Sequence, residues 1–225
     1  MFETSQNSRL YQRIKLLRRF LIGVAVVCIV VPIFLGYIGV LGNNFRVVSE
    51  GKCYRSAQLK SDRLTKAIEA HGIKTVLNLR GERDKEAWYQ DELAACAAEK
   101  VEHVDINVGL GALPKPADMK LLVEKLESAS YPILIHCRSG SDRTGLGSAL
   151  YLHLVEKVPL EQAEAEQVTW RYGHFPIGKA KCINEFFELY HQTSGGKSIK
   201  EWIYDIYPAE YEKAAATHAK KRVAD

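Results

Sequence analysis

The longest apolar stretch in the chain covers residues 20–41 and contains no charged side chain. An α-helix needs about 20 apolar residues to cross the hydrocarbon core of a bilayer. Pro32 and three glycines lie within the stretch, and transmembrane helices contain both residue types more often than soluble helices do. A cleaved signal peptide has a shorter apolar region of roughly 7–15 residues, and a helix on a soluble core would be amphipathic. We therefore expect residues 20–41 to form one retained transmembrane anchor.

Basic residues flank this stretch unequally. Residues 1–19 form a basic flank with five Lys and Arg side chains and one acidic side chain, Glu3. On the other side, the basic residues within a comparable distance are Arg46, Lys52 and Arg55. Because the more basic flank tends to stay in the cytoplasm, we expect a single-pass protein of the bacterial inner membrane whose carboxyl-terminal domain faces the periplasm.

Residues 42–225 alternate between short β-prone segments and longer helical patterns, and they are numerous enough for one domain with its own core. A β-hairpin is expected in residues 45–55. The alternation predicts an α/β fold with a central, mostly parallel sheet flanked by helices, and helices near the carboxyl terminus should cover one face. The expected strands are 73–79, 101–108 and 132–136, and the expected helices are 61–71, 84–100, 117–128, 144–157, 179–191 and one that begins at Pro159.

Composition narrows the classes of partner and cofactor. Much of the net charge of +4 lies in the amino-terminal flank, and no basic stripe with interleaved aromatic residues occurs, so a nucleic-acid partner is not expected. The five cysteines include no C-x-x-C pair and no zinc-like spacing with histidine, so no metal and no other cofactor is expected. Cys53, Cys96 and Cys182 are interpreted as small buried apolar residues, with a disulfide among them as the alternative outside the cytoplasm.

Candidate chemistry concentrates in residues 133–145, whose pattern predicts a strand, a tight loop and a helix. The N–H groups of such a loop converge on one point, and the positive end of the helix dipole adds to them, which makes an anion site. Cys137 lies at the base of the loop, where a cysteine ionises readily. Arg143 closes the loop with a planar fork that can hold two phosphoryl oxygens. The pattern predicts attack of a Cys137 thiolate on phosphorus and a covalent intermediate that water hydrolyses.

The run from His136 to Gly145, HCRSGSDRTG, resembles the HCx5RTG signature of the cysteine-dependent protein tyrosine and dual-specificity phosphatases. Residues 54–58 (YRSAQ) and 73–80 (IKTVLNLR) resemble two further segments of bacterial and atypical dual-specificity members. The resemblance covers about residues 45–175, which is most of the part outside the apolar stretch.

This resemblance implies roles for the matching residues. Cys137 would be the nucleophile and Arg143 the phosphate-binding residue. His136 would orient the loop, with a buried core histidine as the alternative, and Thr144 would donate a hydrogen bond to the sulfur. The remaining cradle would be formed by the backbone of Arg138, Ser139, Gly140 and Ser141, and Arg80 would widen the positive field around the pocket.

The general acid has more than one candidate. A departing alkoxide or phenoxide needs a proton from a carboxylic acid within hydrogen-bond reach. Asp105 lies roughly 30 residues before the cysteine, the spacing of many members, but within a predicted strand. Asp142 lies inside the loop, and its Asp-Arg-Thr sequence resembles the loops of myotubularins and bacterial IphP-like phosphatases, in which this aspartate is thought to act as acid. We rank Asp142 before Asp105, and Asp118 at a helix start after both.

Three function classes remain to be compared. The leading hypothesis is a phosphomonoester hydrolase acting on a phosphorylated lipid or headgroup near the membrane, or on phosphoproteins carrying phospho-Tyr, -Ser or -Thr. A rhodanese-like sulfurtransferase is the second, because its Cys-Arg-x-Gly loop resembles residues 137–140 but is one residue shorter and lacks the Arg-Thr-Gly sequence. A non-catalytic phospho-ligand binder is the third, although such proteins usually lack the cysteine or the arginine.

Overall fold

The computed structural model describes residues 3–36 and 43–224, which belong to two compact units divided between residues 42 and 43. The first unit contains one helix, α1 (Glu3–Gly36), with Pro32 inside it. Its segment Gln12–Phe34 contains an 18-residue window with a mean hydropathy of 2.3, and the segment is long and apolar enough to cross a membrane. The helix thus includes most of the predicted basic flank and of the predicted span, and residues 37–41 of that span lie outside the described residues.

The second unit is built on a five-stranded sheet with the order β1-β2-β5-β3-β4. β1 and β2 form the predicted antiparallel hairpin, and the other neighbouring strands are parallel, so the predicted mostly parallel sheet is confirmed. The strands are β1 (Arg46–Ser49), β2 (Cys53–Ser56), β3 (Thr75–Asn78), β4 (Glu102–Asp105) and β5 (Ile133–His136).

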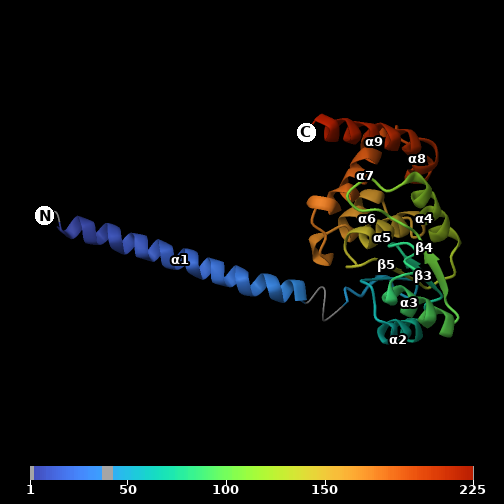
Figure 1. Cartoon of the computed structure of the whole chain (residues 1–225), viewed down its shortest axis with the longest axis horizontal. Helices are drawn as coiled ribbons and strands as arrows, with labels where there is room; N and C mark the ends of the chain where they lie inside the picture. Colours follow the sequence, from blue (N-terminus) through green and yellow to red (C-terminus); the bar gives the residue numbers. More distant parts are fainter. Residues whose placement is uncertain (1–2, 37–42, 225) are drawn as a thin grey trace. The chain divides into compact units, whose positions relative to one another are not determined.

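Helices cover both faces of the sheet because neighbouring side chains of a strand point to opposite faces. On the central strand β5, Ile133 and Ile135 belong to the larger hydrophobic core, whereas Leu134 belongs to the smaller one. Figure 1 shows α2 (Ser61–His71) and α3 (Ala87–Ala98) on one side of the sheet, with α4 (Pro116–Ser128), α5 (Asp142–Leu154) and α6 (Leu160–Gln167) on the other. A strand enclosed in this way is apolar on both faces, which explains the continuous apolar run of β5.

Helix α2 begins at Ser61 as predicted, whereas α3 begins at Ala87 and not at residue 84, and α7 begins at Lys181 and not at residue 179. The N-cap of α2 is Lys60, and no side chain accepts a hydrogen bond there. Helix α5 begins at Asp142, two residues before the predicted start at Thr144, with Ser141 as its N-cap. Asp142 therefore lies in the first turn of a helix, where a negative charge interacts favourably with the helix dipole.

The carboxyl-terminal helices pack on the side of the sheet that α4 and α5 cover, as predicted. They are α7 (Lys181–Thr193), α8 (Ile199–Asp205) and α9 (Tyr207–Ala224). The aromatic rings of Phe186, Trp202 and Tyr207 join them, and the Phe186 ring centroid lies 5.1 Å from that of Tyr207. The Ser198 hydroxyl and the Glu201 carboxylate form a capping box at the start of α8. Short 3-10 turns, η2 (Trp170–Tyr172) and η3 (Gly178–Ala180), lie between α6 and α7.

Candidate active site

The cysteine loop joins the carboxyl end of β5 to the start of α5. Cys137 is buried at its base, with 1% of its surface exposed. Gly140 has φ +70°, and a Cβ atom there would lie 2.6 Å from the backbone nitrogen of Ala57. The loop can therefore lie directly against the end of β2 only because residue 140 has no side chain.

Two buried side chains hold the outer side of the loop through its carbonyl groups. Arg55 of β2 donates to the carbonyl oxygens of Gly140 (2.8 Å) and Ser141 (3.3 Å). Asn44 donates to those of Ser139 (3.1 Å) and Gly140 (3.0 Å). Because the C=O and N–H groups of a planar trans peptide point in opposite directions, these bonds turn the following N–H groups to the other side of the loop. The loop thereby becomes a nest for an anion.

Arg55 can do this because it stays charged although it is fully buried. Burial lowers its pKa, to about 10, and the neighbouring Tyr172 raises it, so the guanidinium remains protonated at neutral pH. It lies 3.9 Å from the ring centroid of Tyr172 and donates to the Gln167 side-chain oxygen at 2.8 Å. The guanidinium thus links the loop to the end of α6 and to η2.

Cys137 differs from the other buried cysteines in its acidity. Burial raises the pKa of its thiol, but the Arg143 guanidinium and hydrogen bonds from Thr144 and from the Ser139 amide outweigh burial, so the pKa lies below its usual value. Cys53 and Cys96 are also buried, and burial raises the pKa of both thiols. All three are free, as is Cys182, so no disulfide joins cysteines in the described part of the chain. The interpretation of Cys53, Cys96 and Cys182 as buried small residues is confirmed.

Arg143 lies in the first turn of α5 beside the sulfur that it stabilises. Its Nη1 is 3.5 Å from the Leu79 carbonyl oxygen. Its buried Nε makes no hydrogen bond within the described part of the chain. The Leu79 carbonyl group, which follows β3, thus holds one side of the guanidinium. The other N–H groups of Arg143 remain available to an anion in the nest.

Arg80 and Arg138 add positive charge at the same place. Burial lowers the pKa of Arg80, and the nearby Arg143 and Arg138 guanidiniums lower it further. The Arg80 guanidinium is stacked 3.6 Å from the Trp88 ring centroid, which holds it against this repulsion. Arg138 is exposed, and its carbonyl oxygen accepts a hydrogen bond from the Gln58 amide at 3.3 Å. A cleft of about 520 Å³ is lined by Gln58, Trp88 and the first residues of α2.

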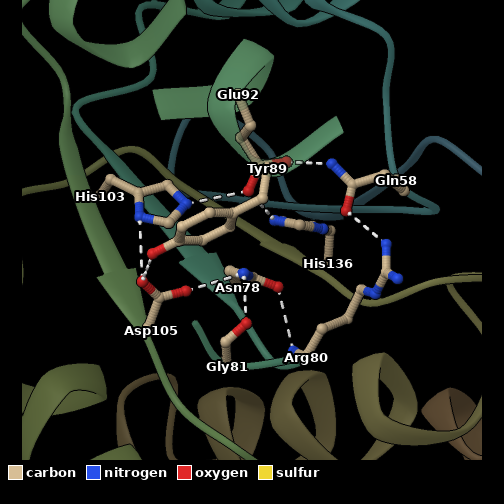
Figure 2. Close-up of polar contacts among 9 residues, drawn as sticks. All are labelled: Gln58, Asn78, Arg80, Gly81, Tyr89, Glu92, His103, Asp105 and His136. Carbon is tan, nitrogen blue, oxygen red and sulfur yellow. Dashed lines mark hydrogen bonds and ion pairs between the residues drawn. The ribbon is translucent and has the colours of Figure 1, made fainter. Parts of the chain in front are cut away.

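His136 precedes the cysteine and points into a buried polar network (Figure 2). The Glu92 carboxylate of α3 lies 3.1 Å from His136 Nε2 and 2.9 Å from His103 Nε2, and it also accepts a hydrogen bond from Gln58. Gln58 in turn accepts from Arg80 at 3.2 Å. The network therefore connects His136, the residue before Cys137, to Arg80.

Asp105 belongs to the far end of the same network (Figure 2). It accepts hydrogen bonds from Asn78 (2.7 Å) and from the Tyr89 hydroxyl, and lies 3.6 Å from His103 Nδ1. In the sheet register, Asp105 pairs with Asn78, which pairs with His136. Asp105 is thus two strands, or roughly 10 Å, from the strand that ends at the cysteine.

Asp142, the other predicted acid, lies next to Arg143 at the start of α5 and is only partly buried. Its Oδ1 is 2.7 Å from His174 Nδ1, and the Oδ1 of Asn184 is 2.8 Å from His174 Nε2. The structure brings Arg143, Thr144 and Ser139 to the Cys137 sulfur, and Arg80 and Arg138 lie near Arg143. The side chains of Asp142 and His136 contact His174 and Glu92, and Asp105 lies two strands away.

The contribution of four residues to this site was not predicted from the sequence: Asn44, Arg55, Glu92 and His174. Only Arg55 had a local signal, because it lies in the YRSAQ segment that resembles the phosphatases. Their contacts with residues 136–142 join positions distant in sequence, from 32 residues for the His174–Asp142 pair to 96 for the Asn44–Gly140 bond. No periodicity or short motif predicts such contacts.

The buried Glu92 carboxylate makes a testable contribution to stability. Burial raises its pKa, but the neighbouring His136 and hydrogen bonds from His103, His136 and Gln58 outweigh burial and lower the pKa to about 2. A carboxylate with a depressed pKa stabilises the fold above its unfolded pKa of about 4.3, and this contribution is lost as pH falls towards 2. We expect Glu92→Gln to lower the free energy of unfolding at pH 7 by about 2–3 kcal/mol and to flatten its pH dependence between about 4.3 and 2.

Urea unfolding followed by circular dichroism across this pH range measures both effects. Glu164→Gln is the matched control, because Glu164 pairs with the exposed His191 at 3.3 Å and a surface pair contributes little. Equal stability of Glu92→Gln and the native chain at pH 7 would contradict the assignment.

Comparison with known proteins agrees with this geometry. Residues 37–165 match the model of a family described as the tyrosine phosphatase family. Among solved structures, PTPMT1 aligns with a TM-score of 0.50 and 15% identity over 67% of this chain and 98% of its own. TpbA of P. aeruginosa aligns with a TM-score of 0.50 and 20% identity over 69% and 93%. The catalytic domain of SIW14 from S. cerevisiae aligns with a TM-score of 0.50 and 19% identity over 67% and 93%.

At these identities the structural likeness establishes the fold, and the family match carries the assignment. No curated protein sequence gave a match. The family model covers more than half of the chain and includes the cysteine loop, which selects a phosphatase over a sulfurtransferase. The chain belongs to the tyrosine phosphatase family and is an enzyme of the cysteine-dependent phosphatase superfamily.

Proposed function

We propose that the chain is a phosphomonoester hydrolase that works through a phosphocysteine on Cys137. The observation that carries this proposal is the contrast between buried thiols: only at Cys137 do a guanidinium and inward N–H groups outweigh burial and lower the pKa. A thiolate is the nucleophilic form of cysteine. The same groups that stabilise its charge also bind a phosphoryl group.

The reaction has two steps at one phosphorus atom. In the first, the Cys137 sulfur forms a bond to phosphorus, the bond to the leaving oxygen breaks, and Asp142 gives that oxygen a proton. In the second, a water molecule attacks phosphorus, its proton returns to Asp142, and the S–P bond breaks with the electron pair on sulfur. Arg143 and the loop amides bind the phosphoryl oxygens throughout, Thr144 stabilises the departing sulfur, and His136 orients the loop through Glu92.

Asp142 is preferred to Asp105 as the acid because of their surroundings. Asp105 accepts two hydrogen bonds and lies near His103 in the Glu92 network, which suits a carboxylate with a structural role. Asp142 is adjacent to Arg143, and its Oδ2 makes no hydrogen bond within the described part of the chain. That oxygen is available to a leaving group.

For the substrate we propose a phosphorylated lipid or lipid headgroup at a membrane surface, with phosphoproteins as the alternative. Residues 37–45 join α1 to β1, and nine residues span at most about 30 Å when fully extended. With α1 as a transmembrane anchor, the site would stay close to the bilayer. Three guanidiniums beside the cysteine loop suit a polyanionic headgroup. Among proteins of this fold, PTPMT1 has been crystallised with PI(5)P and TpbA with phosphotyrosine.

We further propose that the basic flank stays in the cytoplasm, which would place the catalytic domain in the periplasm of a bacterium. The flank with Arg13, Arg18 and Arg19 precedes the uncharged part of α1, which begins at Phe20. This orientation would put the site at the outer leaflet of the inner membrane.

A substrate panel tests the proposed function with the full chain in lipid vesicles. Phosphate release is measured from vesicles containing a phosphatidylinositol phosphate, from a soluble inositol phosphate, and from tyrosine- and serine-phosphorylated peptides. We expect release from the lipid to be at least about 10-fold faster than from the peptides, because surface confinement raises the effective concentration. Faster release from a peptide would select the phosphoprotein alternative, and no release from any substrate would contradict the phosphatase assignment.

A further inference from the structure

The side chain of His174 forms a buried link that ends on Asp142. It lies after η2, with 2% of its surface exposed. Its two ring nitrogens are both engaged, Nδ1 with the Asp142 carboxyl at 2.7 Å and Nε2 with the Asn184 side-chain oxygen at 2.8 Å. The link therefore runs from α7 through the ring to the first turn of α5.

We propose that His174 is a positioning residue for proton donation, and that Asp142 and His174 act as one proton-holding unit rather than Asp142 acting alone. This inference rests on the proposed function, in which Asp142 protonates the leaving oxygen. Asn184 fixes the plane of the ring, the ring fixes Asp142 Oδ1, and Oδ2 is left to face the leaving group. The Nδ1 atom of the His174 ring can also hold the proton of this unit.

The reason for such a unit is the acidity of aspartic acid. An aspartic acid in water loses its proton near pH 4, so a lone side chain would rarely hold the proton that a poor leaving group needs at neutral pH. Two groups that share a proton at 2.7 Å titrate as a pair, with apparent pKa values that belong to both. A histidine partner extends the pH range over which the pair holds a transferable proton.

The charges around the ring favour this arrangement. Burial lowers the pKa of His174, and so does the charge of Arg55 of β2. Hydrogen bonds to Asp142 and Asn184, together with the Asp142 charge, raise it. The raising influences are the stronger, so the pKa lies above its usual value. On α7, Cys182 is the other titratable group that feels the Asp142 charge, and burial keeps it a neutral thiol by raising its pKa. These influences together favour the protonated ring of His174.

The proton balance follows the two steps of the reaction. Before attack, the unit holds one proton that Asp142 Oδ2 delivers to the leaving oxygen as the P–O bond breaks. The unit is then left as an Asp142 carboxylate beside a neutral His174 ring, whose Nε2–H donates to the Asn184 side-chain oxygen. In the second step it takes one proton from the attacking water and returns to its initial state.

The experiment compares pH profiles of kcat for an alkyl phosphate, which is a poor leaving group, and for a dinitrophenyl phosphate, which leaves without a proton. His174→Gln retains a hydrogen-bonding side chain but cannot titrate. We expect the alkaline limb of its alkyl phosphate profile to move by at least about one pH unit to lower pH, with the dinitrophenyl phosphate profile unchanged. In an Asp142→Asn background, His174→Gln should have no further effect on either substrate.

Two companion variants make the result decisive. His191→Gln removes a histidine that pairs with Glu164 on the surface, and it should leave both profiles unchanged. Asn184→Leu removes the Nε2 partner and should move the alkaline limb in the same direction by a smaller amount, which replaces the His174 variant if that variant does not fold. A decrease by one constant factor at every pH, or an unshifted limb, would overturn the proposal. Phosphate release by Cys137→Ser is measured in parallel. Loss of release in that variant would show that the proposed function holds even where the His174 proposal fails.

Discussion

Replacing Cys137 by serine is expected to lower the rate of phosphate release by on the order of 10⁴-fold or more while substrate binding is retained. The hydrogen bonds and the guanidinium that lower the thiol pKa cannot make a serine hydroxyl into an anion near neutral pH. The nest and Arg143 remain, so the variant should still bind a phosphorylated ligand. Single-turnover phosphate release and equilibrium binding of a labelled substrate measure the two effects.

Cys182→Ser is the matched control for this variant. Cys182 is also buried, and its thiol donates to the Lys179 carbonyl oxygen at 3.2 Å, a bond that serine can keep. We expect its rate to stay within about 3-fold of the native rate, because a buried thiol of this kind has a structural role. A Cys137→Ser chain that hydrolyses at the native rate would end the phosphocysteine mechanism.

Arg143→Lys is expected to have the second largest effect, lowering kcat/KM by about 10²–10³-fold. The planar guanidinium can donate two parallel N–H bonds to phosphoryl oxygens, while an ammonium group acts as a point charge. The substitution should also raise the pKa of the Cys137 thiol, because Arg143 is the largest of the influences that lower it. The pH dependence of thiol alkylation by iodoacetate measures this shift separately from catalysis.

The control for this variant is Arg63→Lys on the exposed face of α2. It preserves the net charge in the same way and should change neither kcat/KM nor the alkylation profile. If Arg143→Lys alkylates with the native pH profile, the thiolate is stabilised by the loop amides and not by the guanidinium.

The Glu92 network fixes the orientation of His136, the last residue of β5 before the cysteine loop. His136 ends β5 and directs its ring to Glu92 of α3, on the side of the sheet opposite α5. Cys137 follows on the other side of the strand end and receives the amides of α5 and its loop. Alternation of side chains along a strand therefore separates the structural histidine from the reacting sulfur.

Much of the fold could be predicted from local patterns. The continuous apolar run of β5 and the turns on either side of it predict a central strand, and the helical patterns between the strands predict the crossovers of a parallel sheet. The helices α8 and α9 were not predicted individually, because α8 is short and depends on a capping box and on aromatic packing with α7. The predicted start of α5 lies two residues too late, because Ser141 and Asp142 are residue types that are as common in loops as at helix starts.

By itself, the sequence determined the strand–loop–helix that carries Cys137 and Arg143, the apolar segment of α1 and the α/β architecture. These depend on neighbours within a few residues along the chain, which periodicity and motif spacing report directly. Only the tertiary structure decided that Arg55 and Asn44 turn the loop amides towards the sulfur, that Glu92 orients His136, and that His174 engages Asp142. These contacts join residues at least 32 positions apart, and a buried charge or hydrogen bond of this kind is set by how the elements pack, which no local pattern contains.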